Sequence, residues 1–392
     1  MAKGQRFLLI LIILFLPLQL GKHFWPDFSY VLGLRVDYLA PTIYLTDILI
    51  FWLFSLWGWQ KKSGRVRLTL FPFSVLLFLL VNCFLAANQG AAFYKLVKIL
   101  ELFFFGFYLA NHKDSLNLVP KFLPFPVIGS CLLALAQFIK QGSLNGLFWY
   151  LGERTFNAST PGIAQINLGG RLWLRPYATF SHPNALAGFI VISLILTLPF
   201  LLKKSKILMS SYLLIALSGL GLTFSRTAWL GLTLAVFLTL CSKFKFLLLL
   251  LLAIVMLKIP FLGEQSLTQR ITLAKTAWGL IRVQPLIGVG LNNFIPQLSN
   301  FWQPKILWLQ PVHNIYLLIA AETGLIGLLV FCWFIYVTFK RLNFKSGPLS
   351  ISLMTILFTG FFDHYWLTLQ QTQLLFTLVL GLSWFKKDAR IN

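Results

Sequence analysis

Apolar runs of about 20 residues, the length of one helix across a bilayer, recur along this chain between short polar segments. The pattern predicts an all-α polytopic integral membrane protein whose residues 1–392 form a single transmembrane domain. Twelve transmembrane helices are predicted, at residues 7–20, 42–59, 68–87, 92–110, 119–139, 182–201, 207–224, 227–241, 244–258, 313–338, 348–363 and 370–385.

Basic residues cluster in alternate short loops of this pattern. The clusters lie at residues 61–67, 203–206, 243–245, 340–345 and 386–390. Short loops rich in Lys and Arg face the cytoplasm, so we expect both termini to be cytoplasmic. The net charge of +23 in a chain that is 58% hydrophobic is explained by this orientation. Membrane lipids, and no nucleic acid, are therefore the expected partners.

Two long polar segments, residues 140–181 and 259–312, do not fit a span and face the outside in this topology. Loops of this length in a compact protein are usually functional or disordered, and these contain several tryptophans. Within the larger extracytoplasmic loop, SLTQRITLAKTAWGLIRVQP places Ile271, Ala274, Trp278 and Ile281 on one stripe. We therefore predict an interfacial helix there.

Both outer loops are basic, against the charge rule that the other loops follow. The cations are Lys140, Arg154, Arg171 and Arg175 in the first loop and Arg270, Lys275, Arg282 and Lys305 in the second. Glu153 is the acidic residue of the first loop, and Glu264 is that of the second. Guanidinium groups bind phosphate with paired hydrogen bonds, which suits a lipid-linked phosphate or pyrophosphate. Contact with anionic lipid headgroups is the alternative.

The segment RPYATFSHPNALAG, residues 175–188, leads into an apolar run. Ser181 or His182 precedes Pro183 at the predicted helix start, where a proline is well tolerated. The free N–H groups and the helix dipole favour an anion there, and Arg175 adds a full charge. Helix capping by Ser181 or Asn184 explains the same residues, although not the arginine.

Arg226, in LTFSRTAWLG, lies between two apolar runs with almost no loop, which places it at the outer end of a tight helix hairpin. A charge at this depth needs a partner, such as a substrate anion. The alternative is that Arg226 extends to the interface.

The segment HNIYLLIAAETGLIG, residues 313–327, opens a helix directly after the larger loop. A neutral His313 at that point can act as a general base, or it can simply be an interfacial or capping group. Glu322 lies nine residues further on, on another face of the helix, so we expect it to bond a neighbouring helix through Arg226 or Lys98.

Lys95, Lys98 and Glu101 form a polar stripe on the fourth predicted span. Lys95, nearest the outside, can contact a phosphate. A structural Lys98–Glu101 pair is the alternative explanation of the stripe.

Taken in order, RPYATFSHPNALAG, TFSRTAWLG, GVGLNNF at 288–294 and HNIYLLIAAETGLIG resemble the bacterial O-antigen ligase family, which includes O-antigen polymerases. The resemblance covers residues 170–335. It implies a metal-independent glycosyltransferase of the helical membrane class, with no cofactor, that moves a glycan from undecaprenyl pyrophosphate to lipid A-core or another surface glycan on the outer face of the membrane.

Carried over by motif, Arg175 and Arg226 hold the pyrophosphate and His313 activates the acceptor hydroxyl. We assign substrate binding to Arg171, His182, Asn184, Lys95 and Asn314, and we expect no metal ligands. A surface-polysaccharide polymerase of the same family remains an alternative. So does a polytopic transporter of bicarbonate or lipid, although transport usually needs polar groups near the bilayer midplane and an internal repeat.

Overall fold

The computed structural model describes residues 1–60, 70–239, 264–300, 309–343 and 347–385. The longer helices are α1 (Lys3–Phe15), α2 (Leu45–Gln60), α3 (Leu70–Leu85), α4 (Gln89–Ala110), α5 (Ser115–Phe122), α6 (Pro124–Lys140), α7 (Pro183–Lys204), α8 (Lys206–Leu222), α9 (Arg226–Thr239), α11 (Glu264–Val283), α13 (Ile315–Arg341), α14 (Pro348–Gly360) and α16 (Gln370–Ser383). Two short helices, α12 (Phe294–Gln297) and α15 (Tyr365–Thr368), lie in connections.

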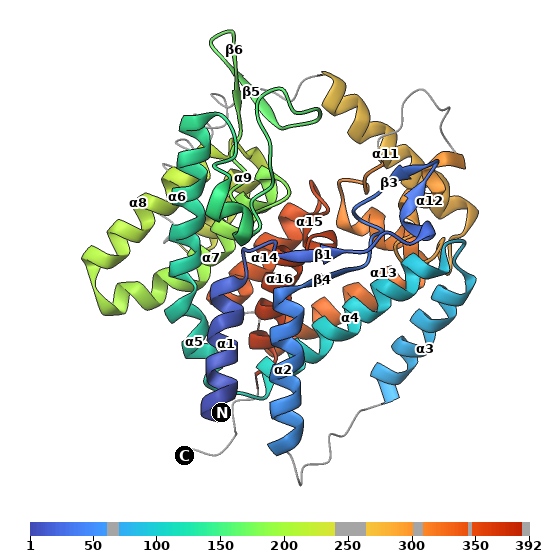
Figure 1. Ribbon diagram of the computed structural model, residues 1–392. Helices are drawn as coiled ribbons and strands as arrows, with labels where there is room; N and C mark the ends of the chain where they lie inside the picture. The colour runs from blue at the N-terminus through green and yellow to red at the C-terminus, as the bar shows by residue number, and fades with distance from the viewer. Residues whose placement is uncertain (61–69, 240–263, 301–308, 344–346, 386–392) are drawn as a thin grey trace.

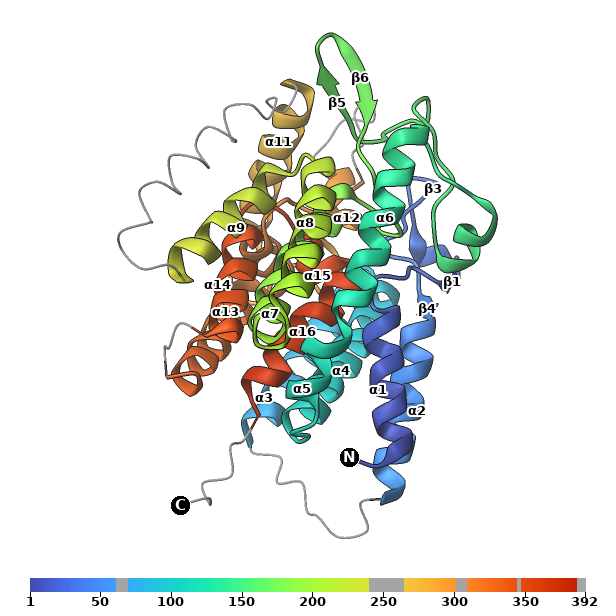
Figure 2. The same cartoon turned by 90° about the vertical axis from the view of Figure 1, so that its left-hand side faces the viewer.

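Three short antiparallel strand pairs complete the fold. They are β1 (Gly21–His23) with β4 (Thr42–Tyr44), β2 (Tyr30–Val31) with β3 (Leu34–Arg35), and β5 (Gln165–Leu168) with β6 (Arg171–Leu174). Figures 1 and 2 show the amino terminus at one end of the molecule and the β5–β6 hairpin with α11 at the other.

The predicted spans correspond closely to these helices, and the differences have local causes. The predicted span 42–59 begins at Leu45, because residues 42–44 pair with β1. The predicted span 119–139 is divided at Leu123, where Pro124 and Pro126 follow. The predicted span 244–258 lies outside the described residues.

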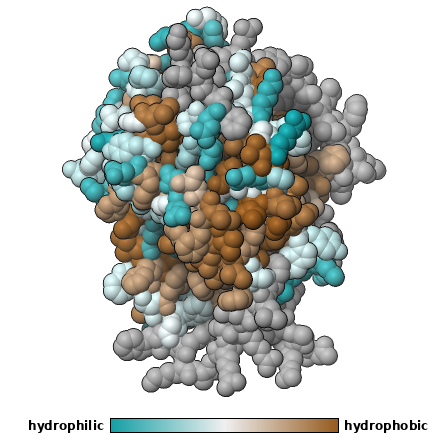
Figure 3. All heavy atoms as spheres, turned by 90° about the vertical axis from the view of Figure 1, so that its right-hand side faces the viewer, coloured by the Kyte–Doolittle hydropathy of each residue, from teal (hydrophilic) through white to brown (hydrophobic). Residues whose placement is uncertain are grey.

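Within the described residues, three helical stretches are long and apolar enough to cross a membrane: 115–140, 183–204 and 315–341. Shorter apolar helices lie beside them, including α8, α9 and α14. Figure 3 shows hydrophobic residues gathered in a broad band on one face, with hydrophilic residues mainly above it. On α3 the side chains of Phe73, Phe84 and Leu85 are all more than 60% exposed, as lipid-facing side chains would be.

The core is built around α7, which is buried along most of its length and packs against α8, α9 and α14. A second buried helix, α16, packs against α4. A side chain at Gly381 would lie 2.7 Å from the carbonyl oxygen of Gly106, so glycine permits this close approach of α16 to α4.

Helix α13 is broken at Gly324, where φ is 67° and ψ is −174°. The segment before α12 docks at the break: Val289 N–H donates to the Ala321 carbonyl, and Leu325 N–H donates to the Pro285 carbonyl. Asn82 of α3 ties the two together, because its Nδ2 donates to the carbonyls of Ile287 and Glu322. The motif GVGLNNF forms a turn here, with positive φ at Gly288 and Gly290.

Candidate active site

The amino terminus of α7 forms one wall of the candidate site. His182 is the residue before the helix, and its Nδ1 accepts a hydrogen bond of 3.1 Å from the Asn184 N–H. The side chain of His182 therefore caps α7, and the predicted alternative of a cap from Ser181 or Asn184 is wrong. This frees the Asn184 side chain to point away from its own helix.

Arg175 is fixed against this wall by two hydrogen bonds. Its Nε donates to the Thr223 carbonyl at 2.7 Å, and its Nη2 donates to Asn184 Oδ1 at 2.7 Å. Thr223 ends the α8 helix just before Arg226 begins α9, so the hairpin that holds Arg226 also anchors Arg175. Burial lowers the pKa of Arg175 to about 10, and the guanidinium stays charged at neutral pH.

Asp363, in the connection between α14 and α15, joins Arg175 to His313. The Asn184 Nδ2 donates to Asp363 Oδ2 at 2.9 Å, and His313 Nδ1 lies 3.3 Å from Asp363 Oδ1. The His364 N–H also donates to Asp363 Oδ1 at 2.9 Å. Three segments that are far apart in the sequence, 175–184, 313–314 and 363–364, thus meet at one buried carboxylate.

The charges around Asp363 keep it ionised. Burial alone would raise its pKa, but the hydrogen bond from His313 and the nearby positive charge of Arg270 hold the pKa well below its usual range. Arg270, on α11, reaches the same connection because its Nη1 donates to the Phe362 carbonyl at 2.8 Å. Burial lowers the pKa of both His182 and His364 to about 3, so both are neutral at physiological pH.

Comparison with protein families gives a match over part of the chain. Residues 178–332 match the O-antigen ligase family model. This segment, less than half of the chain, is called the O-antigen ligase region after the match. No curated protein matches the chain. The resemblance inferred from the sequence motifs is confirmed over this region and supports a glycan transferase of ligase or polymerase type in a bacterial inner membrane.

We call the side chains around Asp363 the Asp363 cluster: Arg175, His182, Asn184, Arg270, His313, Asp363 and His364. The O-antigen ligase region contains His182, Asn184 and His313, and the cluster extends beyond this region at both ends. Arg175 lies three residues before the matched segment, and Asp363 lies well after it. Sequence reasoning therefore found four members of the cluster, Arg175, His182, Asn184 and His313, and missed Asp363, His364 and Arg270. FFDHYW, residues 361–366, was a usable signal, because an acidic residue there interrupts an apolar run.

The other predicted residues lie at varying positions. Asn314 caps α13, its Oδ1 accepting from Tyr316 and Leu317 N–H, and its Nδ2 donates to the Phe361 carbonyl. Arg171 is exposed on the β5–β6 hairpin, with its guanidinium over the Trp173 ring. Lys95 of α4 donates to the Leu367 carbonyl of α15, three residues after His364. The substrate-binding roles of these residues remain predictions.

Two expectations about buried charges have different outcomes. The Lys98–Glu101 pair is confirmed at 2.7 Å, and Asp47 joins it at 2.8 Å from Lys98 Nζ. Glu322, however, does not bond Lys98 or Arg226 among the contacts of the described chain. Its Oε1 accepts from the Phe294 N–H at 3.4 Å, because the docked segment before α12 covers this part of α13.

His313, Asp363 and His364 place possible metal-ligating atoms within 4.8 Å of one another. The same atoms are already engaged in hydrogen bonds. Asp363 Oδ1 bonds His313 and the His364 N–H, while His364 Nδ1 bonds Thr368 Oγ1 at 2.7 Å. The arrangement is that of a carboxylate that orients a histidine, which is a role such pairs have in acid–base sites.

Proposed function

We propose that the protein moves a glycan from undecaprenyl pyrophosphate to a hydroxyl of lipid A-core or another surface glycan, at the outer face of the inner membrane. Polymerisation of a surface polysaccharide is the alternative within the same chemistry. The observation that carries the proposal is a series of hydrogen bonds that runs from Arg175 through Asn184 and Asp363 to His313. Asn184 and His313 lie inside the O-antigen ligase region, and Arg175 and Asp363 lie outside it.

His313 is suited to be the general base. Its Nδ1 faces the Asp363 carboxylate, which favours the tautomer with the proton on Nδ1 and leaves the Nε2 lone pair for the acceptor hydroxyl. The ionised carboxylate also stabilises the imidazolium that forms when the proton arrives. Asp363 therefore acts through His313, as a positioning residue.

Arg175 is suited to hold the pyrophosphate. A guanidinium has five N–H donors, and the bonds to Thr223 and Asn184 use two of them. The remaining donors lie beside the amino terminus of α7, where the helix dipole also favours an anion. Arg226, on the hairpin that anchors Arg175, is proposed as the second cation.

The reaction then balances without a further reactant. The acceptor oxygen forms a bond to the anomeric carbon while the bond from that carbon to the pyrophosphate oxygen breaks. The acceptor proton passes to His313 Nε2, and the electron pair leaves with the pyrophosphate, whose charge Arg175 and Arg226 stabilise. Fixed cations supply this stabilisation, so we propose a metal-independent reaction with no cofactor.

The test is transfer by the purified protein in detergent, with undecaprenyl-pyrophosphate-linked oligosaccharide, candidate acceptors and a chelator. We expect the wild type to transfer and His313→Ala to lose activity by at least 100-fold, because general-base catalysis contributes about 10²–10⁴-fold. His112→Ala is the matched control, because His112 lies just after the carboxyl-terminal end of α4 and is not part of the proposed site. Transfer by His313→Ala at the wild-type rate would remove the base from the mechanism.

Loss of wild-type transfer in chelator, restored by one divalent metal, would instead favour metal binding by His313, Asp363 and His364. No transfer under any condition, together with solute or lipid flux in liposomes, would support a transporter.

A further inference from the structure

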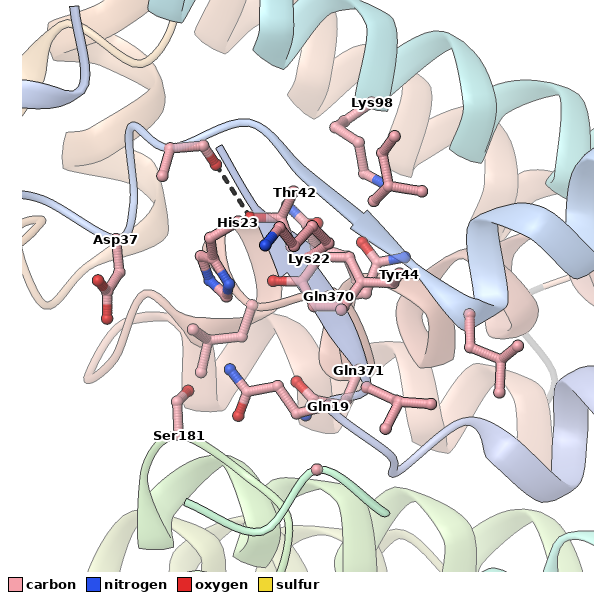
Figure 4. Close-up of a pocket in the computed structure, with 18 of the residues that line it drawn as sticks. Gln19, Lys22, His23, Asp37, Thr42, Tyr44, Lys98, Ser181, Gln370 and Gln371 are labelled. Atoms are coloured by element: carbon pink, nitrogen blue, oxygen red, sulfur yellow. Dashed lines mark hydrogen bonds between the residues drawn. The ribbon is translucent and has the colours of Figure 1, made fainter. Parts of the chain in front are cut away.

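A cavity of about 670 Å³ lies between the amino-terminal strands β1 and β4, helix α4, the 149–154 segment and the start of α16. Figure 4 shows Gln19, Gln370 and Gln371 grouped along it and Ser181 at the edge formed by the segment that leads into α7. This volume is within the roughly 300–1,000 Å³ that is typical of small-molecule sites. None of the catalytic residues proposed above lines it.

The side chains around this cavity include amides, hydroxyls and aromatic rings, beside aliphatic side chains and the charged groups of both signs at Lys22, Asp37, Lys95, Lys98, Glu153 and Arg154. The amides are Gln19, Asn292, Gln370, Gln371 and Gln373, and the aromatic residues include Tyr38, Tyr44, Tyr94, Trp149 and Tyr150. Amides offer both donors and acceptors to hydroxyl groups, and aromatic faces cover apolar C–H surfaces. That combination matches a sugar ring, which has hydroxyls at its edge and C–H groups on its faces.

The two lysines of α4 are already engaged inside the protein, although Lys22 and Arg154 also line the cavity. Lys98 is neutralised by Asp47 and Glu101, and Lys95 donates to the Leu367 carbonyl. The Nε2 atoms of Gln370 and Gln371 are likewise used inside the protein, the first by Asp47 and the second by the Thr179 carbonyl. Their Oε1 atoms accept no hydrogen bond from the described residues and remain available to hydroxyl donors.

Two buried polar atoms at this cavity have no partner in the described chain: Gln19 Oε1 and Ser181 Oγ. Leaving such atoms unsatisfied costs free energy, so each calls for an explanation. They come from segments about 160 residues apart and line the same space. After a small rotation of these two side chains toward the cavity, a ligand with several hydroxyl groups would satisfy both.

The cavity adjoins the Asp363 cluster. The ring of Tyr38, a cavity residue, packs edge to face on His364 at 5.7 Å, and Thr368, another, bonds His364 Nδ1. Ser181 directly precedes His182. We propose that this cavity is a saccharide subsite that holds sugar residues of the substrate beside the reacting centre. This proposal rests on the proposed function, whose substrates carry the glycan.

The test measures binding to three probes with the full-length protein in detergent. They are the lipid-linked oligosaccharide extracted from the source organism, the oligosaccharide released from it by mild acid, and undecaprenyl pyrophosphate without sugar. We expect Gln19→Met and Ser181→Ala each to weaken binding of the free oligosaccharide about 3- to 10-fold, the usual effect of one hydrogen bond. Binding of undecaprenyl pyrophosphate should stay unchanged.

Thermal stability separates a ligand contact from a structural one. Because Gln19 Oε1 and Ser181 Oγ bond nothing in the described protein, these substitutions should leave the melting temperature unchanged or raise it. Ser143→Ala is the matched control, since Ser143 Oγ is buried and bonds the Phe156 backbone. It should lower the melting temperature and leave oligosaccharide binding intact.

An aromatic pair provides a second comparison. Trp149→Ala should weaken oligosaccharide binding, whereas Trp52→Ala, at a tryptophan of similar exposure on α2 outside the cavity, should not. Unchanged oligosaccharide binding in Gln19→Met, Ser181→Ala and Trp149→Ala would overturn the subsite.

The three probes also distinguish the two proposals. If oligosaccharide binding depends on these residues but undecaprenyl pyrophosphate does not bind, the saccharide subsite is supported and the proposed donor is contradicted. If undecaprenyl pyrophosphate binds but oligosaccharide binding does not depend on these residues, the proposed donor is supported and the subsite is contradicted.

Discussion

Asp363 accepts hydrogen bonds from three sources: the Asn184 amide, the His313 imidazole and the His364 backbone. Each of them restricts where the carboxylate can lie, so the orientation of His313 depends on α7 as well as on its own segment. The position of Arg175 depends on the same Asn184 side chain. One asparagine therefore relates the proposed base to the proposed pyrophosphate ligand.

Asp363→Asn should lower kcat by about 10²–10⁴-fold while the KM for the lipid-linked donor changes little, because an amide can stabilise the wrong tautomer of His313. Steady-state kinetics of the two variants, Asp363→Asn and Asp363→Glu, measure this. Partial recovery in Asp363→Glu would agree with a positioning role. An increase in KM without a change in kcat would contradict it.

Arg175→Lys should bind the pyrophosphate donor poorly, because an ammonium cannot bond Thr223, Asn184 and a phosphate in the geometry of the planar guanidinium. We expect undecaprenyl pyrophosphate binding to weaken at least 10-fold, measured directly in detergent. Arg35→Lys is the control and should bind normally, because the exposed Arg35 lies over the Trp25 ring at 5.3 Å and has no proposed role in the site.

Acid should destabilise the folded protein through its neutral histidines. The pKa of both His182 and His364 falls from 6.5 in the unfolded chain to about 3 in the fold, so between these values the unfolded state binds more protons. Stability is therefore lost as pH falls from about 6.5 toward 3, by at most about 1.4 kcal/mol per pH unit for each histidine. Asp363 adds to this only below its ordinary pKa, near 4.

Melting temperatures from pH 7.5 to 4.5 in wild type and His364→Asn measure this effect. The variant should show the shallower decline with acid, because it has one histidine fewer to charge. Equal slopes would show that His364 takes up no proton on unfolding in this range.

Four cluster residues could be predicted from sequence because each lies in a polar motif at the mouth of an apolar run. Arg175, His182, Asn184 and His313 were found in this way. Asp363 ends a predicted span, so hydropathy assigned it to a helix boundary and gave no reason to pair it with His313, 50 residues away. Contacts at that separation depend on how helices pack, which periodicity does not encode.

The break in α13 is the main departure at the level of elements. Hydropathy across residues 313–338 indicates one continuous span, and a lone glycine in such a run is compatible with a helix. The structure instead has a positive φ at Gly324, where the docked 285–290 segment supplies hydrogen bonds that the broken helix lacks. The partner segment, rather than the helix sequence, determines the break.

Gly324→Ala should destabilise the protein by about 2 kcal/mol or more, since the new Cβ would lie 2.1 Å from the Leu286 carbonyl oxygen at an unfavourable φ. Gly129→Ala is the control, because that helical position has no atom within 4 Å of the added carbon and should be neutral or slightly stabilising. Thermal unfolding in detergent compares them. Equal melting temperatures would contradict the constraint.

The helix predicted in the larger outer loop is present as α11, but its faces differ from the predicted stripe, and its place at the membrane interface stays a prediction. Leu273, Ala277, Leu280 and Ile281 are buried against the rest of the protein. Ile271 and Trp278 of the predicted stripe are 47% and 52% exposed. The helix therefore has apolar residues on two sides, and the period of 3.6 alone could not tell which side meets the protein.

For the whole molecule, hydropathy predicted where helices lie along the chain, but not which helices occupy the centre. Both α7 and α3 read as apolar spans, yet α7 is buried and α3 exposes Phe73 and Phe84. A helix that is apolar all round suits either lipid or protein, so composition does not distinguish the two. A small residue at a contact is one physical difference, because a Cβ at Gly188 of α7 would lie 2.6 Å from the Tyr365 hydroxyl.

The proposed orientation can be tested by labelling single cysteines with a membrane-impermeant maleimide. We expect Ser159→Cys, in the 140–181 loop, to react in intact spheroplasts. Lys204→Cys, at the end of α7, should react only after the membrane is permeabilised. Both tests need the native cysteines replaced. The opposite pattern would invert the topology and place the Asp363 cluster on the cytoplasmic side.

The contacts of Asn82 have a consequence for biogenesis. Its amide is made 240 residues before the Glu322 carbonyl that it bonds. During synthesis α3 therefore enters the membrane with a buried polar side chain whose partners do not yet exist, and α13 later arrives with a break that needs them. Helix α3 therefore cannot make its final contacts until residue 322 has been synthesised. Quality-control proteases would meet a chain stopped before residue 322 as an incompletely assembled bundle.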